Sequence, residues 1–299
     1  MFKKIMFATS ATPACDHAAR VAFNMAKRYS AHIDVFHVLG VPTRGFSQVV
    51  LDVKTKEKVV LDDEYQAWVK EEVRTYYTNQ LRDVSSAEIH VVIGVPHREI
   101  LRHIRNAEPD LIVMGGSTGQ DEESVYKQSM TGSTLQRVAK ASPAPILVVS
   151  RPAASFWGEI SNVVFGTDFS KSSDAAFKFA LKVAKETDGE LHLFHALDIS
   201  ALHMGRMLTQ DEIESKIRDA RQLMRGRYVP QMEGFKKFAV EVWEGLPYIE
   251  IVKYAREKQA DLIVLAHHSQ KRDEKDARLG SNVEQVILRA SCPVISINR

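Results

Sequence analysis

Short apolar runs alternate with amphipathic stretches along the whole chain. One run, Leu111–Met114, is flanked by turn residues, which is typical of a strand buried on both faces. In the stretch from Pro13 to Tyr29, the apolar residues Val21, Met25 and Tyr29 recur every four positions and predict an amphipathic helix. Strands that alternate with helices predict a parallel sheet with right-handed crossovers and helices on both faces, a doubly wound α/β fold.

The same pattern gives the expected elements. In the first half we expect strands at 4–9, 32–39, 88–93, 111–114 and 145–149, and helices at 13–29 and 62–82 and from Pro96 and Ser133. In the second half we expect strands near 162–167, 190–196, 237–243, 261–266 and 293–298. Pro96 suits the first turn of a helix, where its missing N–H costs nothing, and Ser170 is a good helix N-cap.

The second half of the chain repeats the first. Three segments recur in the same order, with shifts of 158, 151 and 148 positions: Val35–Leu39 as Leu193–Leu197, Asp110–Val113 as Asp261–Val264, and Gly132–Ser133 as Gly280–Ser281. A unit of about 150 residues is the size of a domain rather than of a solenoid repeat. We therefore predict one domain over residues 1–151, a linker over 152–160 and a second domain over 161–299.

Composition narrows the classes of function. A net charge of +2 is too small an excess of positive charge to indicate binding to nucleic acid or to an anionic membrane, so neither is an expected partner. Two cysteines, Cys15 and Cys292, are too few for a disulfide framework and suit a reducing compartment. The chain has no apolar run of about 20 residues and no signal-peptide pattern at Met1. These features predict a soluble, cytoplasmic protein.

A glycine-rich stretch follows the buried strand at Leu111. Gly116 and Gly119 leave room for close approach of a ligand to the backbone, and Gly132-Ser133-Thr134 opens the next helix. A helix N-terminus with free N–H groups and hydroxyls is a natural phosphate site. Ligands of doubly wound sheets bind at the carboxyl ends of the strands, so this stretch predicts a nucleotide site.

Several of these motifs together match a known family. They are Phe165–Ser170 at the end of a first strand, the two Asp-Leu-Ile-Val strands, the Gly-Ser pairs, and the run Pro145–Val149. In these residues the chain resembles a tandem universal stress protein, with one universal stress protein A-type domain in each half. The resemblance implies two Rossmann-like domains, each with a five-stranded parallel sheet of order 3-2-1-4-5, paired through their fifth strands as an internal pseudo-dimer. It also implies a stress-response or signalling role exercised through nucleotide occupancy or unidentified protein partners. Whether two chains form a homodimer stays open.

Nucleotide-binding members of the family carry Gly-x2-Gly-x9-Gly-(Ser/Thr) after the fourth strand and an aspartate after the first. In the first half the spacer between Gly119 and Gly132 has 12 residues, three more than the pattern, and Ser10 replaces the aspartate. The candidate contacts for ATP or a related adenine nucleotide in this half are Ser10, Val38, Gly116, Gly119, Gly132, Ser133 and Thr134. The acidic run Asp121–Glu123 would repel a triphosphate unless it faces away or holds Mg²⁺.

The second half keeps the aspartate and loses the glycines. The candidate contacts there are Asp168, Gly280, Ser281 and Asn282. His267 and Gln270 stand where the first two glycines belong, so side chains occupy the space that phosphates need. We therefore prefer the first half as the nucleotide site.

A zinc site is a competing interpretation of the second half, with Asp168, His203, His267 and His268 as candidate ligands. The simpler interpretation makes His267 and His268 solvent-facing loop residues in an abandoned nucleotide pocket, and we assign no metal. His37 and His195 lie inside second strands, where packing or hydrogen bonding accounts for them.

The sequence shows no nucleophile elbow, Walker loop or zinc-protease helix. A phosphate cradle without a positioned base or lysine predicts binding, with at most slow ATP hydrolysis and no catalytic residue. Two alternatives stay open: a scaffold that binds no nucleotide and acts through protein partners, and a weak ATPase.

Overall fold

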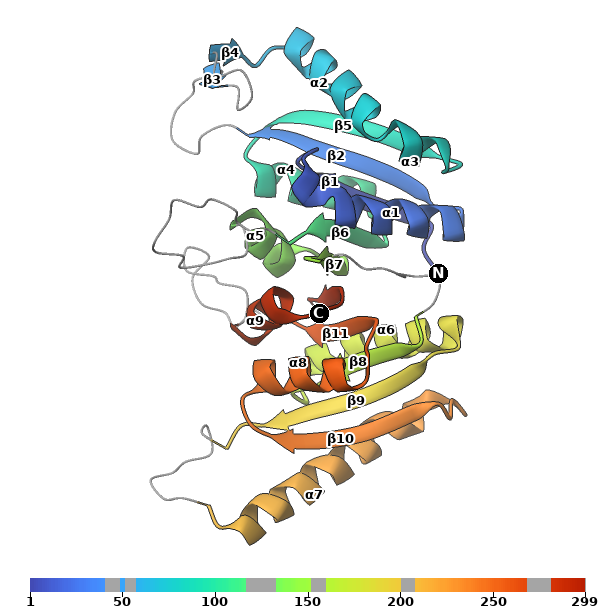
Figure 1. Cartoon of the computed structure of the whole chain (residues 1–299), viewed down its shortest axis with the longest axis vertical. Coiled ribbons are helices and arrows are strands. Elements are labelled where there is room, and N and C mark those ends of the chain that lie inside the picture. The colour runs from blue at the N-terminus through green and yellow to red at the C-terminus, as the bar shows by residue number, and fades with distance from the viewer. Residues whose placement is uncertain are drawn as a thin grey trace. The chain divides into compact units, whose positions relative to one another are not determined.

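A computed structural model describes residues 1–40, 49–51, 58–116, 133–151, 160–199, 208–267 and 281–298. The chain divides into two compact units, Met1–Val149 and Ser150–Arg299, which are labelled element by element in Figure 1. Among the described residues, no helix combines the length and the apolar content that crossing a membrane requires.

The first unit alternates strands and helices as the pattern predicts. Its elements are β1 (Lys4–Thr9), η1 (Pro13–Cys15), α1 (Asp16–Tyr29), β2 (His32–Gly40), β3 (Val49–Leu51), β4 (Lys58–Val60), α2 (Asp63–Tyr76), α3 (Thr78–Arg82), β5 (Ala87–Gly94), α4 (Pro96–Ala107), β6 (Leu111–Gly115), α5 (Ser133–Ala141) and β7 (Ile146–Val149).

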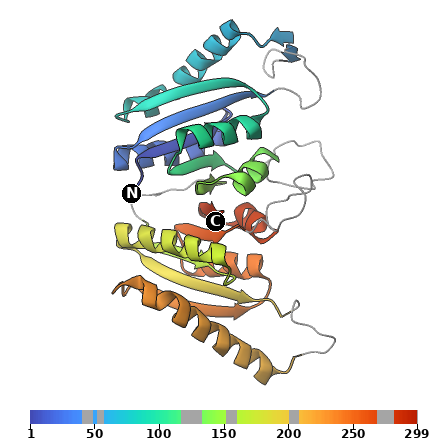
Figure 2. The same ribbon diagram turned by 180° about the vertical axis from the view of Figure 1, so that it is seen from behind.

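The sheet of the first unit has the order β7-β6-β1-β2-β5, and all its neighbouring strands are parallel. Numbered along the chain, these five strands have the predicted order 3-2-1-4-5. Strands β1 and β6 are central and almost fully buried, which explains their unbroken apolar sequences. Figures 1 and 2 show α1, α2 and α3 on one face of this sheet and α4 and α5 on the other.

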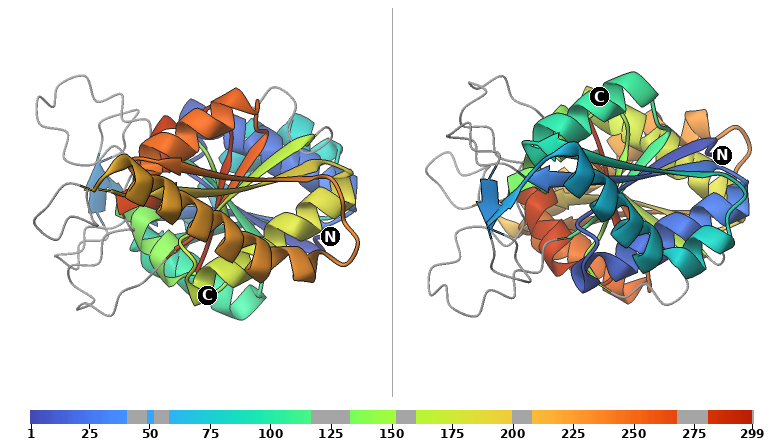
Figure 3. Two further views of the ribbon diagram at one scale, coloured as in Figure 1. Left: turned by 90° about the horizontal axis from the view of Figure 1, so that it is seen from below. Right: turned by 90° about the horizontal axis from the view of Figure 1, so that it is seen from above.

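The second unit repeats this order. Its elements are β8 (Asn162–Gly166), α6 (Lys171–Thr187), β9 (Glu190–Leu197), α7 (Gln210–Tyr228), η3 (Val229–Met232), β10 (Phe238–Glu244), α8 (Pro247–Glu257), β11 (Leu262–Ala266), α9 (Ser281–Arg289) and β12 (Val294–Ile297). The strands follow the order β10-β9-β8-β11-β12, again parallel throughout. Figure 3, which shows the ribbon from below and from above, has helices on both sides of the strands.

The aspartate of the repeated Asp-Leu-Ile-Val segment has a structural role in both units. Asp110 Oδ2 accepts hydrogen bonds from the backbone N–H groups of Lys3 and Lys4, at 2.6 and 2.9 Å. Asp261 Oδ2 does the same for Ser161 and Asn162, at 2.8 and 3.0 Å. The motif therefore joins the start of the fourth strand of each unit to the start of its first strand.

Two features depart from the predicted elements. The helix expected over residues 62–82 is interrupted at Tyr77, whose buried hydroxyl hydrogen-bonds Thr9 Oγ1 at 2.7 Å. The short antiparallel pair β3 and β4 lies in a stretch where no strand was expected. Ser170 caps α6 as predicted, because its side chain accepts a hydrogen bond from the Ser173 N–H.

Candidate functional site

A cavity of about 280 Å³ opens in the first unit at the carboxyl ends of three neighbouring strands. Its walls come from the ends of β1, β2 and β6, the turn into η1, and the beginnings of α4 and α5. The lining residues are Ala8, Thr9, Ser10, Cys15, Phe36, His37, Val38, Pro96, Ile100, Met114, Gly115, Thr134 and Leu135. This is the edge of a doubly wound sheet at which ligands bind.

The structure brings together three of the residues predicted from the sequence. Ser10, Val38 and Thr134 all line the cavity. Gly116 follows the lining residue Gly115, and its N–H donates to the Val149 carbonyl at 3.0 Å. That N–H therefore joins β6 to β7 and is not available to a phosphate.

The remaining predicted residues of this half lie at the start of α5 or before it. Ser133 is the first residue of α5, beside the cavity. Gly119, Gly132 and the acidic run at 121–123 lie outside the described residues.

At the cavity mouth, hydroxyl and thiol groups occupy the position that carries an aspartate in the second unit. Ser10 Oγ hydrogen-bonds Thr12 Oγ1 at 2.8 Å and Cys15 Sγ at 3.2 Å. The hydroxyl groups of Ser10 and Thr12 are hydrogen-bonding partners for a polar ligand and, unlike an aspartate, carry no fixed negative charge that would repel phosphate.

Below them, His37 is held in one tautomer. Its Nδ1 donates to the Thr9 carbonyl at 2.9 Å, which leaves Nε2 as the acceptor. Burial lowers the pKa of His37, although the hydrogen bond to Thr9 works in the opposite direction. The imidazole is therefore neutral near pH 7 and offers the cavity no positive charge.

The same place in the second unit is covered by an aromatic ring. His195 corresponds to His37 and makes the same bond, from Nδ1 to the Thr167 carbonyl at 2.8 Å. The ring of Phe169 lies against His195, with 4.5 Å between ring centroids. Its counterpart in the first unit is Ala11, and both residues have a positive φ, 61° and 53°. The second unit thus carries a large side chain where the first carries a methyl group.

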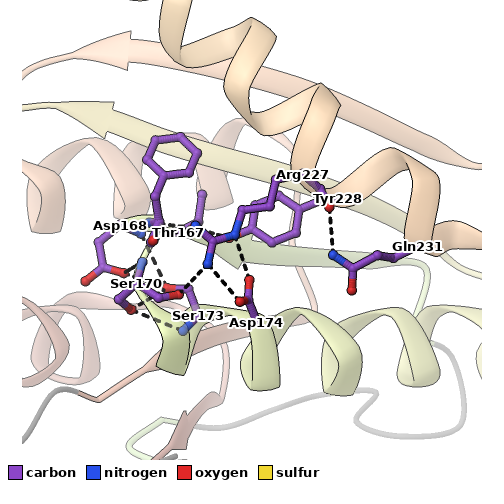
Figure 4. A network of polar contacts seen from close by, with 9 residues as sticks. Thr167, Asp168, Ser170, Ser173, Asp174, Arg227, Tyr228 and Gln231 are labelled. Carbon is purple, nitrogen blue, oxygen red and sulfur yellow. Dashed lines mark hydrogen bonds and ion pairs between the residues drawn. The ribbon is translucent and has the colours of Figure 1, made fainter.

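An arginine fixes the turn that carries Phe169 (Figure 4). Arg227, near the end of α7, donates to both carboxylate oxygens of Asp174, at 2.8 and 2.7 Å. It also donates to the carbonyls of Phe169 and Ser170, at 2.6 and 3.1 Å. The planar guanidinium therefore ties the end of α7 to the beginning of α6.

Asp168 is exposed, and two hydrogen bonds of its carboxylate lie within the same turn. Its Oδ1 accepts hydrogen bonds from the Ser170 N–H at 3.0 Å and from Ser173 Oγ at 2.6 Å (Figure 4). This geometry stabilises the start of α6, so the aspartate has a local structural function whether or not a nucleoside is bound nearby.

Comparison with known proteins assigns the chain to a family. A family model described as the universal stress protein family matches residues 1–150 and, separately, 159–298. The chain belongs to the universal stress protein family. It carries two such domains in tandem, as the resemblance implied.

Two relatives from Methanocaldococcus jannaschii each match about half of the chain. The universal stress protein MJ0531 of Methanocaldococcus jannaschii is 30% identical over 146 residues, which are 46% of this chain and 81% of that protein. The universal stress protein MJ0577 of the same organism is 27% identical over 160 residues, 50% of this chain and 96% of that protein. A universal stress protein structure from Archaeoglobus fulgidus matches the fold of the whole chain, with a TM-score of 0.71, 21% identity, and coverage of 99% of this chain and 96% of that one.

Within the second universal stress protein domain, the expectation that His267 faces solvent is wrong. This residue is only 1% exposed. It directly follows the last residue of β11, and its N–H donates to the carbonyl of Ile297, the last residue of β12, at 2.7 Å. Asn282 is exposed in the first turn of α9, and Ser281 begins that helix. Gly280, Gln270, His203 and His268 lie outside the described residues.

The described ligands of the predicted zinc site, Asp168 and His267, do not form a metal-binding group. Among the described residues, groups of three or more candidate metal ligands occur around Asp34 in the first domain. Asp168 and His267 belong to neither of these groups.

Sequence reasoning missed most of the lining of the cavity in the first domain. It took His37 as a packed or hydrogen-bonded residue of a strand, which its bond to Thr9 confirms, but did not place it in the cavity wall. It also did not consider Ala11, which follows the lining residue Ser10. The signal was present in the repeat, because aligning Ala11 with Phe169 sets a small residue against a large one at the mouth of the predicted site.

Proposed function

We propose that the first universal stress protein domain binds ATP or a related adenine nucleotide in the cavity lined by Ser10, Val38 and Thr134. The chain then acts as a stress-response or signalling protein whose output depends on the occupancy of that site. The observation that carries this proposal is the cavity itself, at the carboxyl ends of β1, β2 and β6.

The position of the cavity supports a nucleotide. The strand order reverses between β1 and β6, and ligands of doubly wound sheets bind at this switch point. Helix α5 begins beside the cavity, and its second residue, Thr134, lines it. The free N–H groups of that first turn favour a phosphate group.

The size and polarity of the cavity suggest how the ligand lies. Small-molecule pockets start at roughly 300 Å³, so the described walls suit a nucleoside, with the phosphates extending towards the start of α5. The apolar side chains of Val38, Ile100 and Met114 offer a surface for a base. Mg²⁺ enters this proposal only as the counter-ion of a triphosphate, without an assigned protein ligand.

The chemistry of the walls favours binding over hydrolysis. Among the described lining residues there is no lysine, arginine or carboxylate, and His37 is neutral and held by Thr9. Phosphoryl transfer requires positioned charge at the phosphates and an oriented nucleophile, and this part of the wall supplies neither. We therefore propose a binding protein rather than an efficient ATPase.

The proposal is tested with a pair of reciprocal substitutions taken from the repeat. Purified protein is denatured and its supernatant checked for released nucleotide, and titration calorimetry with ATP is then run on the wild type, Ala11→Phe and Phe169→Ala. Ala11→Phe places in the first domain the ring that covers His195 in the second, at a backbone conformation that Phe169 already adopts. It should abolish binding, whereas Phe169→Ala should leave it intact.

Two further variants distinguish the domains. Gly132→Glu should abolish binding, and Asp168→Ala should leave it nearly unchanged. Loss of binding in Asp168→Ala alone would place the site in the second domain. An absence of both heat and released nucleotide would favour the scaffold that acts through protein partners.

A further inference from the structure

A buried aspartate lies inside β2, on the side of the sheet that α4 covers. Asp34 is 1% exposed, and four cationic or imidazole groups surround its carboxylate. These are Lys4 Nζ at 3.2 Å, His32 Nε2 at 3.0 Å, His103 Nε2 at 3.1 Å and His90 Nε2 at 3.4 Å. Three imidazoles therefore converge on one buried carboxylate, and imidazole and carboxylate are both groups that ligate metal ions.

We propose that Asp34, His90 and His103 bind a divalent transition-metal ion, with Zn²⁺ as the best fit. Two imidazole nitrogens and one carboxylate oxygen, with a fourth position open, are a donor set that zinc takes. The three donor atoms lie within 4.8 Å of one another. Small side-chain rotations bring such a group to the roughly 2.0–2.2 Å bonds of a zinc site.

The scaffold holds these ligands on three different elements. Asp34 comes from β2, His90 from β5 and His103 from α4, so a bound ion would fasten the helix to the two strands. The ring of Phe36 packs against the imidazoles of His103 and His90, with centroid separations of 4.5 and 6.2 Å. This apolar contact limits the orientations of both rings and excludes water from one side of the site.

A supporting residue orients the carboxylate. His32 contacts Asp34 Oδ1 through Nε2, and its Nδ1 hydrogen-bonds Ser86 Oγ at 2.6 Å. Partners of this kind fix the geometry of the groups that bind a metal. Glu88, whose carboxylate is 3.6 Å from His90 Nε2, is the nearest candidate for the fourth ligand.

Lys4 provides the positive charge that a metal would replace. Its ammonium contacts Asp34 Oδ2, the oxygen that also contacts His103. The Lys4 side chain is 33% exposed at the start of β1 and is long and flexible, so it can move into solvent when an ion arrives.

The second domain shows that the fold does not need this cluster. At the places of Lys4, Asp34 and His103 it has Asn162, His192 and Tyr254. There His192 hydrogen-bonds Asn162 Oδ1 at 3.2 Å and the Tyr254 hydroxyl at 3.3 Å. A hydrogen-bonded network with a single histidine therefore fills the same position, with a Glu190 carboxylate oxygen 4.0 Å from His192 Nδ1. The set of three histidines around one aspartate belongs, among the described residues, to the first domain.

This comparison supplies substitutions that the fold accepts. Untagged, chelator-treated full-length protein is titrated with Co²⁺ and followed by the visible absorption of low-symmetry cobalt(II), and Zn²⁺ affinity is measured by displacement. The wild type should bind one Co²⁺ with an intense visible band. His103→Tyr and His90→Gln should each lower the affinity about 100-fold or more, because each removes a ligand, whereas His97→Gln, on the same helix but outside the cluster, should not.

Lys4→Asn separates a metal site from a purely hydrogen-bonded network. It removes the competing cation and should raise the Co²⁺ affinity by roughly tenfold. Circular dichroism checks that each variant is folded. Absence of the visible band in the folded wild type, or an unchanged band in both His90→Gln and His103→Tyr, would show that the cluster serves only to hydrogen-bond Asp34.

Discussion

Two histidines occupy equivalent places in the two domains and make the same hydrogen bond. His37 and His195 each donate from Nδ1 to the carbonyl of a threonine at the end of the first strand, Thr9 or Thr167. Burial lowers the pKa of both, and the hydrogen bonds to the threonine carbonyls oppose that shift only in part. The conserved geometry of the repeat thus keeps both imidazoles neutral.

This shift predicts how stability depends on pH. Since the folded-state pKa lies below the usual 6.5, the unfolded chain binds more protons below that pH than the folded chain does. Stability should fall as pH drops from about 7 towards the folded pKa, by up to about 1.4 kcal/mol per pH unit for each histidine. Urea unfolding at about pH 7.5 and pH 5.5 measures the loss. The double variant His37→Gln with His195→Gln should show a smaller loss than the wild type, and an equal loss would contradict the assignment.

At the scale of elements, the sequence predicted the five strands of each parallel sheet, but not β3 and β4, and most helices, because their patterns are local. The apolar runs of β1 and β6 and the caps at Pro96 and Ser170 are each visible within a few residues. The break between α2 and α3 was not visible, because it depends on Tyr77 reaching Thr9 across 68 positions of sequence.

The polar cluster around Asp34 was hidden for the same reason. His90 and His103 are separated from Asp34 by 56 and 69 positions of sequence. The three residues come together through the pairing of β2 with β5 and the packing of α4. The phosphate side of the nucleotide site was easier to propose, since Gly132–Thr134 is one continuous segment. Its apolar walls, such as Ile100, come from other elements and could not be named from spacing.

The junction of α6 and α7 depends on one guanidinium. Arg227→Lys keeps the charge but loses the planar fork that contacts Asp174 and two carbonyls. Because the pair is partly exposed, we expect a loss of about 1–2 kcal/mol in the free energy of unfolding. Chemical denaturation measures it. Arg225→Lys, on the exposed side of the same helix, is the matched control and should change stability little; an equal effect of both variants would remove the special role of Arg227.

At the scale of the whole molecule, the two domains keep one fold and differ at corresponding positions of their sites. Ala11, beside the proposed nucleotide cavity, corresponds to Phe169 in the second domain, and Asp34, in the histidine cluster, corresponds to His192. At the first of these positions the first domain has the smaller side chain, and at the second it has more candidate metal ligands. Such divergence is available to a tandem chain, since each copy retains its own core while its sites change independently.

Both proposed sites therefore belong to the first domain, and they should be separable. The nucleotide cavity lies at the carboxyl ends of the strands, whereas Asp34 lies near the amino end of β2. Two elements contribute to both sites: α4 through Ile100 and His103, and β2 through Phe36, which lines the cavity and packs against His90 and His103. Equilibrium dialysis of the full chain should find one nucleotide and one Zn²⁺ per molecule. Ala11→Phe should lose the nucleotide and keep the metal, and His103→Tyr should lose the metal and keep the nucleotide. Two nucleotides per chain would show that the ring of Phe169 does not close the second domain. Loss of both ligands from either folded variant would show that the two sites are not independent, because α4 or Phe36 would then transmit the change from one to the other.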